Sequence, residues 1–107
     1  MELSESEKLV LKASLTEKAE FLKALAHPVR LCILRMLLDG SSNVTQMNCC
    51  IGASQSNLSQ HLAKLRSAGI VKGTREGAEI YYSIKDGEMQ HAIACILNGQ
   101  NTDNTEE

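Results

Sequence analysis

Six polar side chains without a formal charge are grouped between Ser54 and Leu62: Gln55, Ser56, Asn57, Ser59, Gln60 and His61. Leucines at positions 58, 62 and 65 follow the i, i+4, i+7 spacing of a helix that packs one side on a core, so the polar set is expected on the outer face. Glutamine and asparagine can form paired hydrogen bonds with adenine, whereas a solvated helix normally carries Glu and Lys pairs. The pattern therefore favours a helix that reads DNA bases over a merely polar surface helix.

Basic residues follow this polar segment. Between Gly40 and Arg75 the chain has no acidic residue, while five glutamates fall within the first twenty residues. The formal net charge of −2 is unfavourable for binding phosphate, but this distribution leaves one segment able to face it. Near the end of the polar helix, Lys64 and Arg66 are either anchors to the DNA backbone or plain solubilising charges.

Cys49 and Cys50 are adjacent thiols just before the polar segment. If the apolar residues of a short helix face inward, Cys50 lies at the edge of the buried face and Cys49 on the exposed side. Oxidation, a bridging polysulfide, or arsenite with Cys95 or another thiol as third ligand would distort this helix and move its neighbour. The alternative is that Cys49 and Cys50 are two small residues at positions that tolerate many side chains.

The four cysteines form no disulfide framework and no CxxC pair, so reduced thiols are expected.

Two short helices joined by a glycine must position these residues. The first has about seven residues and ends at Gly52, and the second begins near Ser54 and ends at Ala68. Such a pair is typical of a helix-turn-helix unit, whose second helix contacts DNA.

A β-hairpin is predicted directly after this unit. Its strands cover 70–72 and 79–83, and the turn contains Arg75. Lys72 and Arg75 would bring the hairpin against the DNA backbone or the minor groove. The alternative is an ordinary exposed hairpin.

The remaining segments are predicted to be helical. One helix begins with the capping-box pattern at Ser14 and is broken at His27, which precedes a proline. A core helix follows at about 29–38, and a last helix covers about 87–97. The chain is thus predicted to be mainly α with a small β-hairpin, in the order α-α-α-α-β-β-α. The predicted divisions are a flexible or helical extension at 1–13, one domain at 14–97 and a disordered polar tail at 98–107.

Three stretches resemble the ArsR/SmtB family of winged-helix repressors: LKALAHPVRL (22–31), SQSNLSQHLAKLRSAGIV (54–71) and REGAEIYYSI (75–84). The resemblance covers roughly residues 15–97. It implies a homodimer joined by the first and last helices, bound to an inverted-repeat operator near a promoter and released when an effector arrives. It also implies recognition helices one DNA turn, ~34 Å, apart. By the same resemblance, the residues that approach bases are Gln55, Ser56, Ser59 and Gln60.

The sensing sites of this family are incomplete here. Arsenite and cadmium types carry Cys-Val-Cys where this chain has Asn-Val-Thr at 43–45, without a soft ligand. Zinc types place Asp and His pairs on the last helix, but Gly99 has no side chain to complete four ligands. Some relatives use one cysteine on the second helix and one on the last. Cys32 and Cys95 lie on those helices, offset from the usual positions, and are either sensor thiols or small buried residues.

Other classes of protein fit the sequence less well. An enzyme with a Ser or Cys nucleophile needs a histidine and an orienting group around a pocket, and the chain shows no nucleophile-elbow or phosphate-binding motif. A winged helix that only binds proteins would carry acidic or apolar residues on the polar helix. No apolar run reaches the ~18 residues that span a bilayer and the first residues are acidic, so a cytoplasmic location without a membrane partner is expected.

The predicted function is therefore sequence-specific repression by a DNA-bound homodimer, relieved by an oxidant, reactive sulfur or arsenite acting on thiols. Two alternatives stay open at this point: a metal-responsive repressor with a non-standard site, and a winged-helix interaction module that does not bind DNA.

Overall fold

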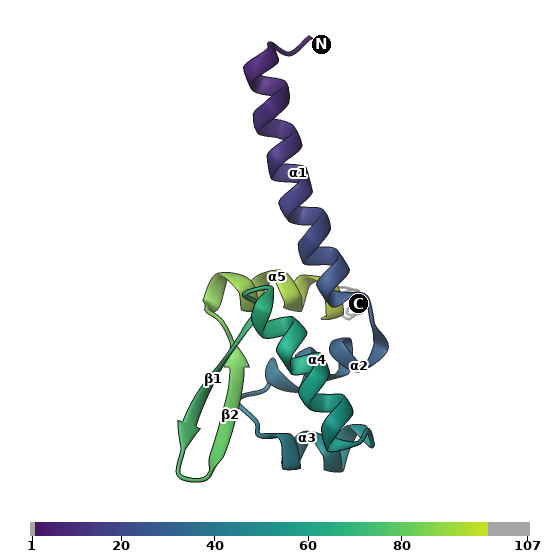
Figure 1. Cartoon of the computed structure of the whole chain (residues 1–107), viewed down its shortest axis with the longest axis vertical. Coiled ribbons are helices and arrows are strands. Elements are labelled where there is room, and N and C mark those ends of the chain that lie inside the picture. The colour runs from purple at the N-terminus through teal and green to yellow at the C-terminus, as the bar shows by residue number, and fades with distance from the viewer. Residues whose placement is uncertain (1, 99–107) are drawn as a thin grey trace, which may run out of the picture.

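Residues 2–98 are described by the structure, which is a computed structural model. Within this range, five helices and one antiparallel hairpin follow one another in the predicted order, which confirms the winged helix-turn-helix fold (Figure 1). Asn98 ends the last helix, and residues 99–107 of the predicted tail lie outside the described range. The elements are α1 (Glu5–Leu25), α2 (Pro28–Leu37), α3 (Val44–Ile51), α4 (Gln55–Ser67), β1 (Val71–Glu76), β2 (Glu79–Ile84) and α5 (Gly87–Asn98).

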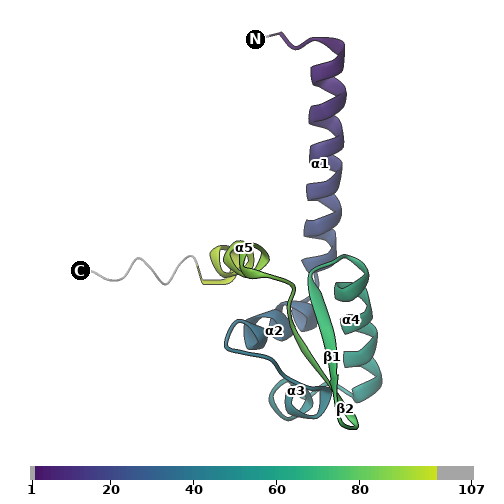
Figure 2. The same ribbon diagram turned by 90° about the vertical axis from the view of Figure 1, so that its left-hand side faces the viewer.

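The core is enclosed by α2, α3 and α4, with the hairpin and α5 closing its remaining sides (Figures 1 and 2). One face of α4 is fully buried because leucines recur along it at helical spacing. Branched aliphatic side chains and one methionine fill the space opposite, as expected for a chain with three aromatic residues. The most deeply buried side chains are Ile33, Leu34, Met47, Leu58, Leu62, Leu65, Ile70 and Ile93.

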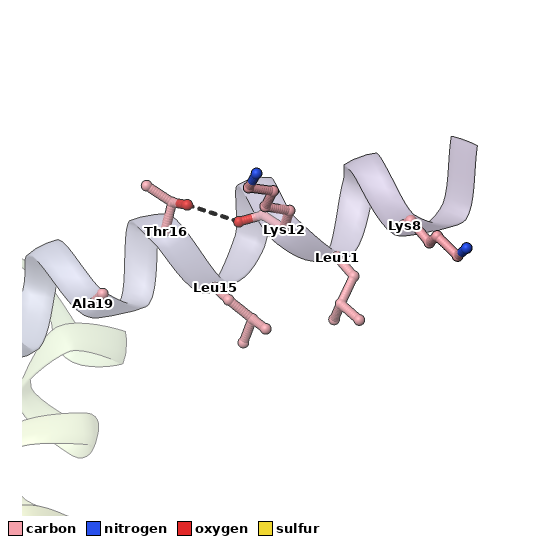
Figure 3. A pocket seen from close by; sticks show the side chains of 6 residues that line it. All are labelled: Lys8, Leu11, Lys12, Leu15, Thr16 and Ala19. Carbon is pink, nitrogen blue, oxygen red and sulfur yellow. Dashed lines mark hydrogen bonds between the residues drawn. The ribbon is translucent and has the colours of Figure 1, made fainter. Parts of the chain in front are cut away.

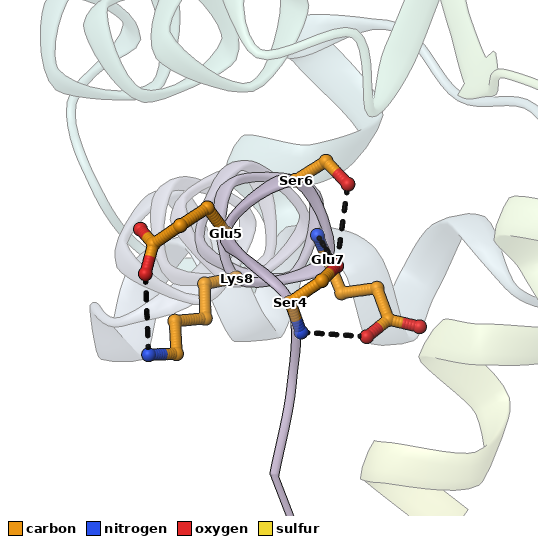
Figure 4. A network of polar contacts seen from close by, with 5 residues as sticks. All are labelled: Ser4, Glu5, Ser6, Glu7 and Lys8. Atoms are coloured by element: carbon orange, nitrogen blue, oxygen red, sulfur yellow. Dashed lines mark hydrogen bonds and ion pairs between the residues drawn. The ribbon is translucent and has the colours of Figure 1, made fainter.

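Helix α1 begins ten residues earlier than the capping pattern at Ser14 predicts, so that prediction was wrong. Ser4 caps the helix: its hydroxyl accepts from the Glu7 amide at 3.1 Å, and the Glu7 carboxylate accepts from the Ser4 amide at 2.8 Å (Figure 4). Nothing between these two Ser-x-x-Glu patterns breaks a helix. Because extending a helix costs far less than nucleating one, it continues to the upstream cap. The predicted extension is helical from Glu5 onward.

The N-terminal half of α1 stands clear of the rest of the domain (Figures 1 and 2). Leu25 is the one fully buried residue of this helix, so α1 is attached by its last turns. Further out, Leu11 and Leu15 point to the same side of the helix beside Ala19 (Figure 3). Isolated apolar side chains are common on surfaces, but a row of leucines along a projecting helix is a typical contact surface.

The hairpin is longer than predicted, because β1 continues to Glu76. Every β1 residue after Val71 is exposed, so these positions carry no apolar alternation that would have marked a strand. Gly73 is required where the two strands pair, since a Cβ there would lie 3.0 Å from Ile80 Cγ2 and 3.2 Å from Tyr82 Cε1. The missing side chain lets the Tyr82 ring cross the strand.

A short backbone bridge joins the hairpin to the helix-turn-helix unit. The Ser42 amide donates to the Tyr82 carbonyl at 3.0 Å, and the Tyr82 amide donates to the Ser42 carbonyl at 2.8 Å. The next residue, Asn43, caps α3, and its side chain and that of Gln46 bond each other's backbone amides. The start of α3 is therefore fixed to the β-hairpin, which we call the wing.

The turn between α3 and α4 depends on Gly52. This residue ends α3 with φ of 79°, in the left-handed region, and a Cβ added there meets no atom within 4 Å. A side chain at Gly52 would therefore destabilise the turn through backbone strain and not through a steric clash with other residues.

We expect the Gly52→Ala variant to lower the free energy of unfolding by about 1 kcal/mol, because alanine is strained at this φ. Gly87→Ala is the matched control: Gly87 begins α5, has no unusual φ and has open space around it, so alanine should be neutral or raise stability by up to about 1 kcal/mol. Urea unfolding followed by circular dichroism measures both. Equal effects of the two variants would contradict this account of the turn.

Candidate nucleic-acid interface

The outer face of α4 is exposed and polar, as predicted. Ser54 starts the helix, its hydroxyl accepting from the Asn57 amide at 3.0 Å. No side chain of the exposed set forms a hydrogen bond with another residue in the range 2–98, so all their donors and acceptors face solvent. The exposed set comprises Gln55, Ser56, Asn57, Ser59 and Gln60.

His61 does not belong to that face, and the prediction that it lies on the outside was wrong. Only 9% of the residue is exposed. Its ring lies against that of His27, with 4.3 Å between ring centroids, and its Nδ1 is 3.1 Å from Arg30 Nη1. The helical periodicity of α4 places position 61 beside Leu58 and Leu65 and therefore at the margin of the buried face.

Arg30 holds this group of residues together. Its Nε donates to the Ala24 carbonyl in the last turn of α1 at 2.6 Å, while Nη1 reaches His61 on α4. A guanidinium has only donors, so Nδ1 of His61 must accept, and the imidazole is neutral with its proton on Nε2. Arg30 was not among the site residues predicted from the sequence. One sequence feature could have indicated it: Arg30 is the single charged residue in the otherwise apolar first turn of α2.

The electrostatics of this junction agree with the hydrogen bonds. Burial lowers the pKa of His61 below its ordinary value of 6.5, and electrostatic interactions with His27, Arg30 and Lys64 lower it further. The folded state therefore favours the uncharged ring.

The predicted basic residues are all exposed, but they do not form one patch. Lys64 and Arg66 lie near the end of α4. Neighbouring residues of a strand alternate in direction, so Lys72 and Arg75, three positions apart on β1, lie on opposite faces of the hairpin. Within residues 2–98 none of these four cations takes part in an ion pair.

The tip of the hairpin carries both signs of charge. Glu76 pairs with Glu79 across the strands next to the turn, and Arg75 pairs with Ile80. The two carboxylates reduce the attraction of the tip for phosphate. Among residues 75–80, Arg75 is the one cation beside these two carboxylates.

All four cysteines are free and exposed. The interpretation of Cys32 and Cys95 as buried residues was therefore wrong. Cys49 is exposed as predicted, and Cys50 is exposed as well. Cys95 Sγ lies 3.7 Å from Nε2 of His91, one turn earlier on α5. Cys50 lines a shallow recess beside the backbone bridge between Ser42 and Tyr82.

The residues of the metal sites discussed for the sequence do not come together among residues 2–98 of one chain. Within the described range, no group of three or more His, Cys, Asp or Glu side chains could hold a metal ion. Cys95 is thus not gathered with Cys49 and Cys50 into a three-thiol arsenite site. The last-helix zinc position that includes Gly99 lies outside the described residues. Among residues 2–98, no helix has both the length and the apolar character needed to cross a membrane.

Known proteins are similar to this chain in sequence. The family model "Bacterial regulatory protein, arsR family" matches residues 27–72, from the cap of α2 into β1. The transcriptional repressor PagR of Bacillus anthracis is 43% identical over 84 residues, which cover 78% of this chain and 84% of PagR. The transcriptional activator HlyU of Vibrio cholerae is 40% identical over 104 residues, 92% of each chain.

A solved structure agrees with these sequence matches. Reduced HlyU from Vibrio cholerae has a TM-score of 0.78 at 33% identity, covering 87% of this chain and 97% of that chain. The similarity thus includes α4, the β-hairpin and most of the flanking helices. The chain belongs to the ArsR family of bacterial transcriptional regulators, which are not enzymes.

Proposed function

We propose that this chain represses transcription as a homodimer bound to an inverted-repeat operator, and that an effector releases it by modifying cysteines. The observation that carries the proposal is the exposed, uncharged face of α4, whose side chains have no partners among residues 2–98. A face of this kind matches the donor and acceptor pattern that base pairs present in the major groove. The site of action is then the cytoplasm, where the DNA is.

The proposed contacts divide between bases and phosphates. Base reading falls to Gln55, Ser56, Asn57, Ser59 and Gln60 in the first half of α4. Lys64 lies farther along the helix and would neutralise a phosphate, as would Lys72 or Arg75 from the wing. His61 is left out of this set because it is buried against Arg30.

A second copy of the chain is the proposed partner of α1 and α5. Leu11, Leu15 and Leu22 fall within a ~40° sector of α1 and are 47%, 55% and 56% exposed. Ile96 on α5 is also exposed. A domain of this size buries limited apolar surface by itself, and a dimer would cover these side chains. Two-fold symmetry would then match an inverted repeat.

Repression is the proposed direction of control. A dimer bound over a promoter blocks transcription by occupancy alone, which requires only the reading unit and the dimer helices. PagR, named a repressor, shares 43% identity with this chain over 84 residues. HlyU is named an activator, so direction differs among relatives that share the fold.

The proposed sensor is the pair Cys49 and Cys50. Both are exposed at the end of α3, directly before the turn that leads into the reading helix. Peroxide would convert one thiolate to a sulfenic acid, and condensation with the neighbouring thiol would release water and form a disulfide. Neighbours on a helix point about 100° apart, so closing this bond requires the end of α3 to unwind. The solved structure of HlyU in its reduced form gives support from a relative for redox control.

Gln60→Ala should weaken operator binding by about 1–3 kcal/mol and relax the preference at one base position, because it removes a base contact. Arg75→Ala should instead weaken binding to every sequence and lower the salt dependence by about one counterion. Selection of duplexes from a random pool, followed by binding isotherms across salt concentrations, measures both. Lys12→Ala, on the N-terminal half of α1, is the charge-matched control (Figure 3). Failure of the reduced parent to enrich any sequence would favour an interaction module.

The double variant Leu11→Glu/Leu15→Glu should sediment as a monomer at concentrations where the parent is a dimer, since it places charge on the proposed contact face. Its operator affinity should fall by at least about a hundredfold, because two linked half-sites become independent. Ala13→Glu, on another side of the same helix, should leave both properties unchanged. A dimeric double variant would contradict this interface.

The double variant Cys49→Ser/Cys50→Ser should bind the operator like the reduced parent but keep it after treatment with peroxide, a sulfane sulfur donor or arsenite. The parent should release DNA on one of these treatments and recover with reductant. The variant Cys32→Ser/Cys95→Ser is the matched control and should respond like the parent. If the control loses the response instead, the sensor is the pair on α2 and α5.

A further inference from the structure

Arg30 is a buried cation without a carboxylate partner among residues 2–98. It is 9% exposed, and the two ion pairs in this range, Lys8 with Glu5 and Arg35 with Asp39, do not include it. Its two hydrogen bonds go to a backbone carbonyl and to an imidazole. A charge kept under these conditions is costly, so each of its partners matters for the stability of the junction.

The two partners belong to different helices. The Ala24 carbonyl is in the last turn of α1, where the negative end of the helix dipole favours a cation. His61 is in the middle of α4, at the margin of its buried face. Arg30 itself lies in the first turn of α2. One side chain thus connects the projecting helix, the core helix and the reading helix.

This junction sets the direction of α1. The helix has one fully buried residue, Leu25, and packs against α4 near its end. The chain then turns at His27, whose Nδ1 accepts from the Val29 amide at 3.1 Å and whose ring contacts His61. The angle between α1 and α4 therefore depends on few groups, and Arg30 and the two histidines supply the polar contacts among them.

We propose that Arg30 and His61 are positioning residues for DNA binding, which hold the reading helix α4 at a fixed angle to α1. This inference rests on the proposed function, because α1 is taken to join the two copies. When the junction opens, each domain keeps its fold, but the two reading helices no longer match both half-sites at once.

Protonation of His61 would open the junction. A charged ring carries a hydrogen on Nδ1 and can no longer accept from Arg30, so two donors would face each other at 3.1 Å. The charged and titratable groups around the ring are His27 and Arg30 from α2 and its cap, and Lys64 from α4. From α1, the Ala24 carbonyl bonds to Arg30, and Glu17 and Glu20 line the same groove as Arg30 without an ion pair to it.

The sign of the pH effect follows from the direction of the pKa shift. Because the pKa of folded His61 lies below 6.5, the junction is intact above that pH and is lost as the pH falls through the lowered value. Exposed histidines act in the opposite sense, since their positive charge strengthens binding to phosphate. A loss of affinity at acidic pH therefore distinguishes His61 from general electrostatics.

The test compares operator affinity of the parent dimer and three variants at two pH values: about pH 7.5, and the lowest pH at which the parent is still a folded dimer. His61→Asn retains an acceptor near the Nδ1 position and cannot be protonated. It should bind like the parent at the higher pH and at least about tenfold more tightly than the parent at the lower pH. Arg30→Met should bind at least about tenfold more weakly at both values, whereas Arg35→Met, the control from the exposed side of the same helix, should match the parent.

Circular dichroism and sedimentation of each protein at each pH establish that it is a folded dimer. If Arg30→Met does not fold, Arg30→Lys, which keeps the charge but makes fewer bonds, takes its place and should show a smaller loss. Identical pH profiles for the parent and His61→Asn would overturn the inference. Failure of the parent to bind any duplex at the higher pH would instead overturn the proposed function, so the two failures are distinguishable.

Discussion

The structure depends on the burial of one face of α4 by Leu58, Leu62 and Leu65. This burial fixes the rotation of the helix about its axis, and the opposite face is then exposed as a consequence. The same residues close the core against α2 and α3. Stability and recognition are thus two sides of a single helix, and a change that rotated α4 to improve the core would also redirect every polar side chain on its outer face.

Much of the fold could be predicted because its signals are periodic. The spacing of apolar residues located α2 to α5, and Gly52 located the turn between α3 and α4. Two features carried no such signal. The start of α1 was placed at Ser14 because two capping patterns occur and only packing or helix propagation decides between them. The outer part of β1 was missed because its residues face solvent on both sides.

The candidate site was predicted in part, for a related reason. Periodicity separates an outer from an inner face, so the exposure of Gln55 and Gln60 followed from the leucines. It does not resolve the margin between the faces, where His61 lies, and it does not show that a distant Arg30 is its partner. The exposure of the cysteines depends on how the helices pack, which composition alone does not determine.

The bridge between Ser42 and Tyr82 has a consequence for solubility. A two-stranded hairpin has two open edges, and each offers unpaired amides and carbonyls to a strand from another molecule. Tyr82 already uses its outward backbone groups on Ser42, so the edge of β2 is capped in its middle. The β1 edge carries charged residues at three of its six positions, Lys72, Arg75 and Glu76, which disfavour a hydrophobic strand neighbour. The wing is therefore protected against edge-to-edge aggregation while it stays exposed at the surface.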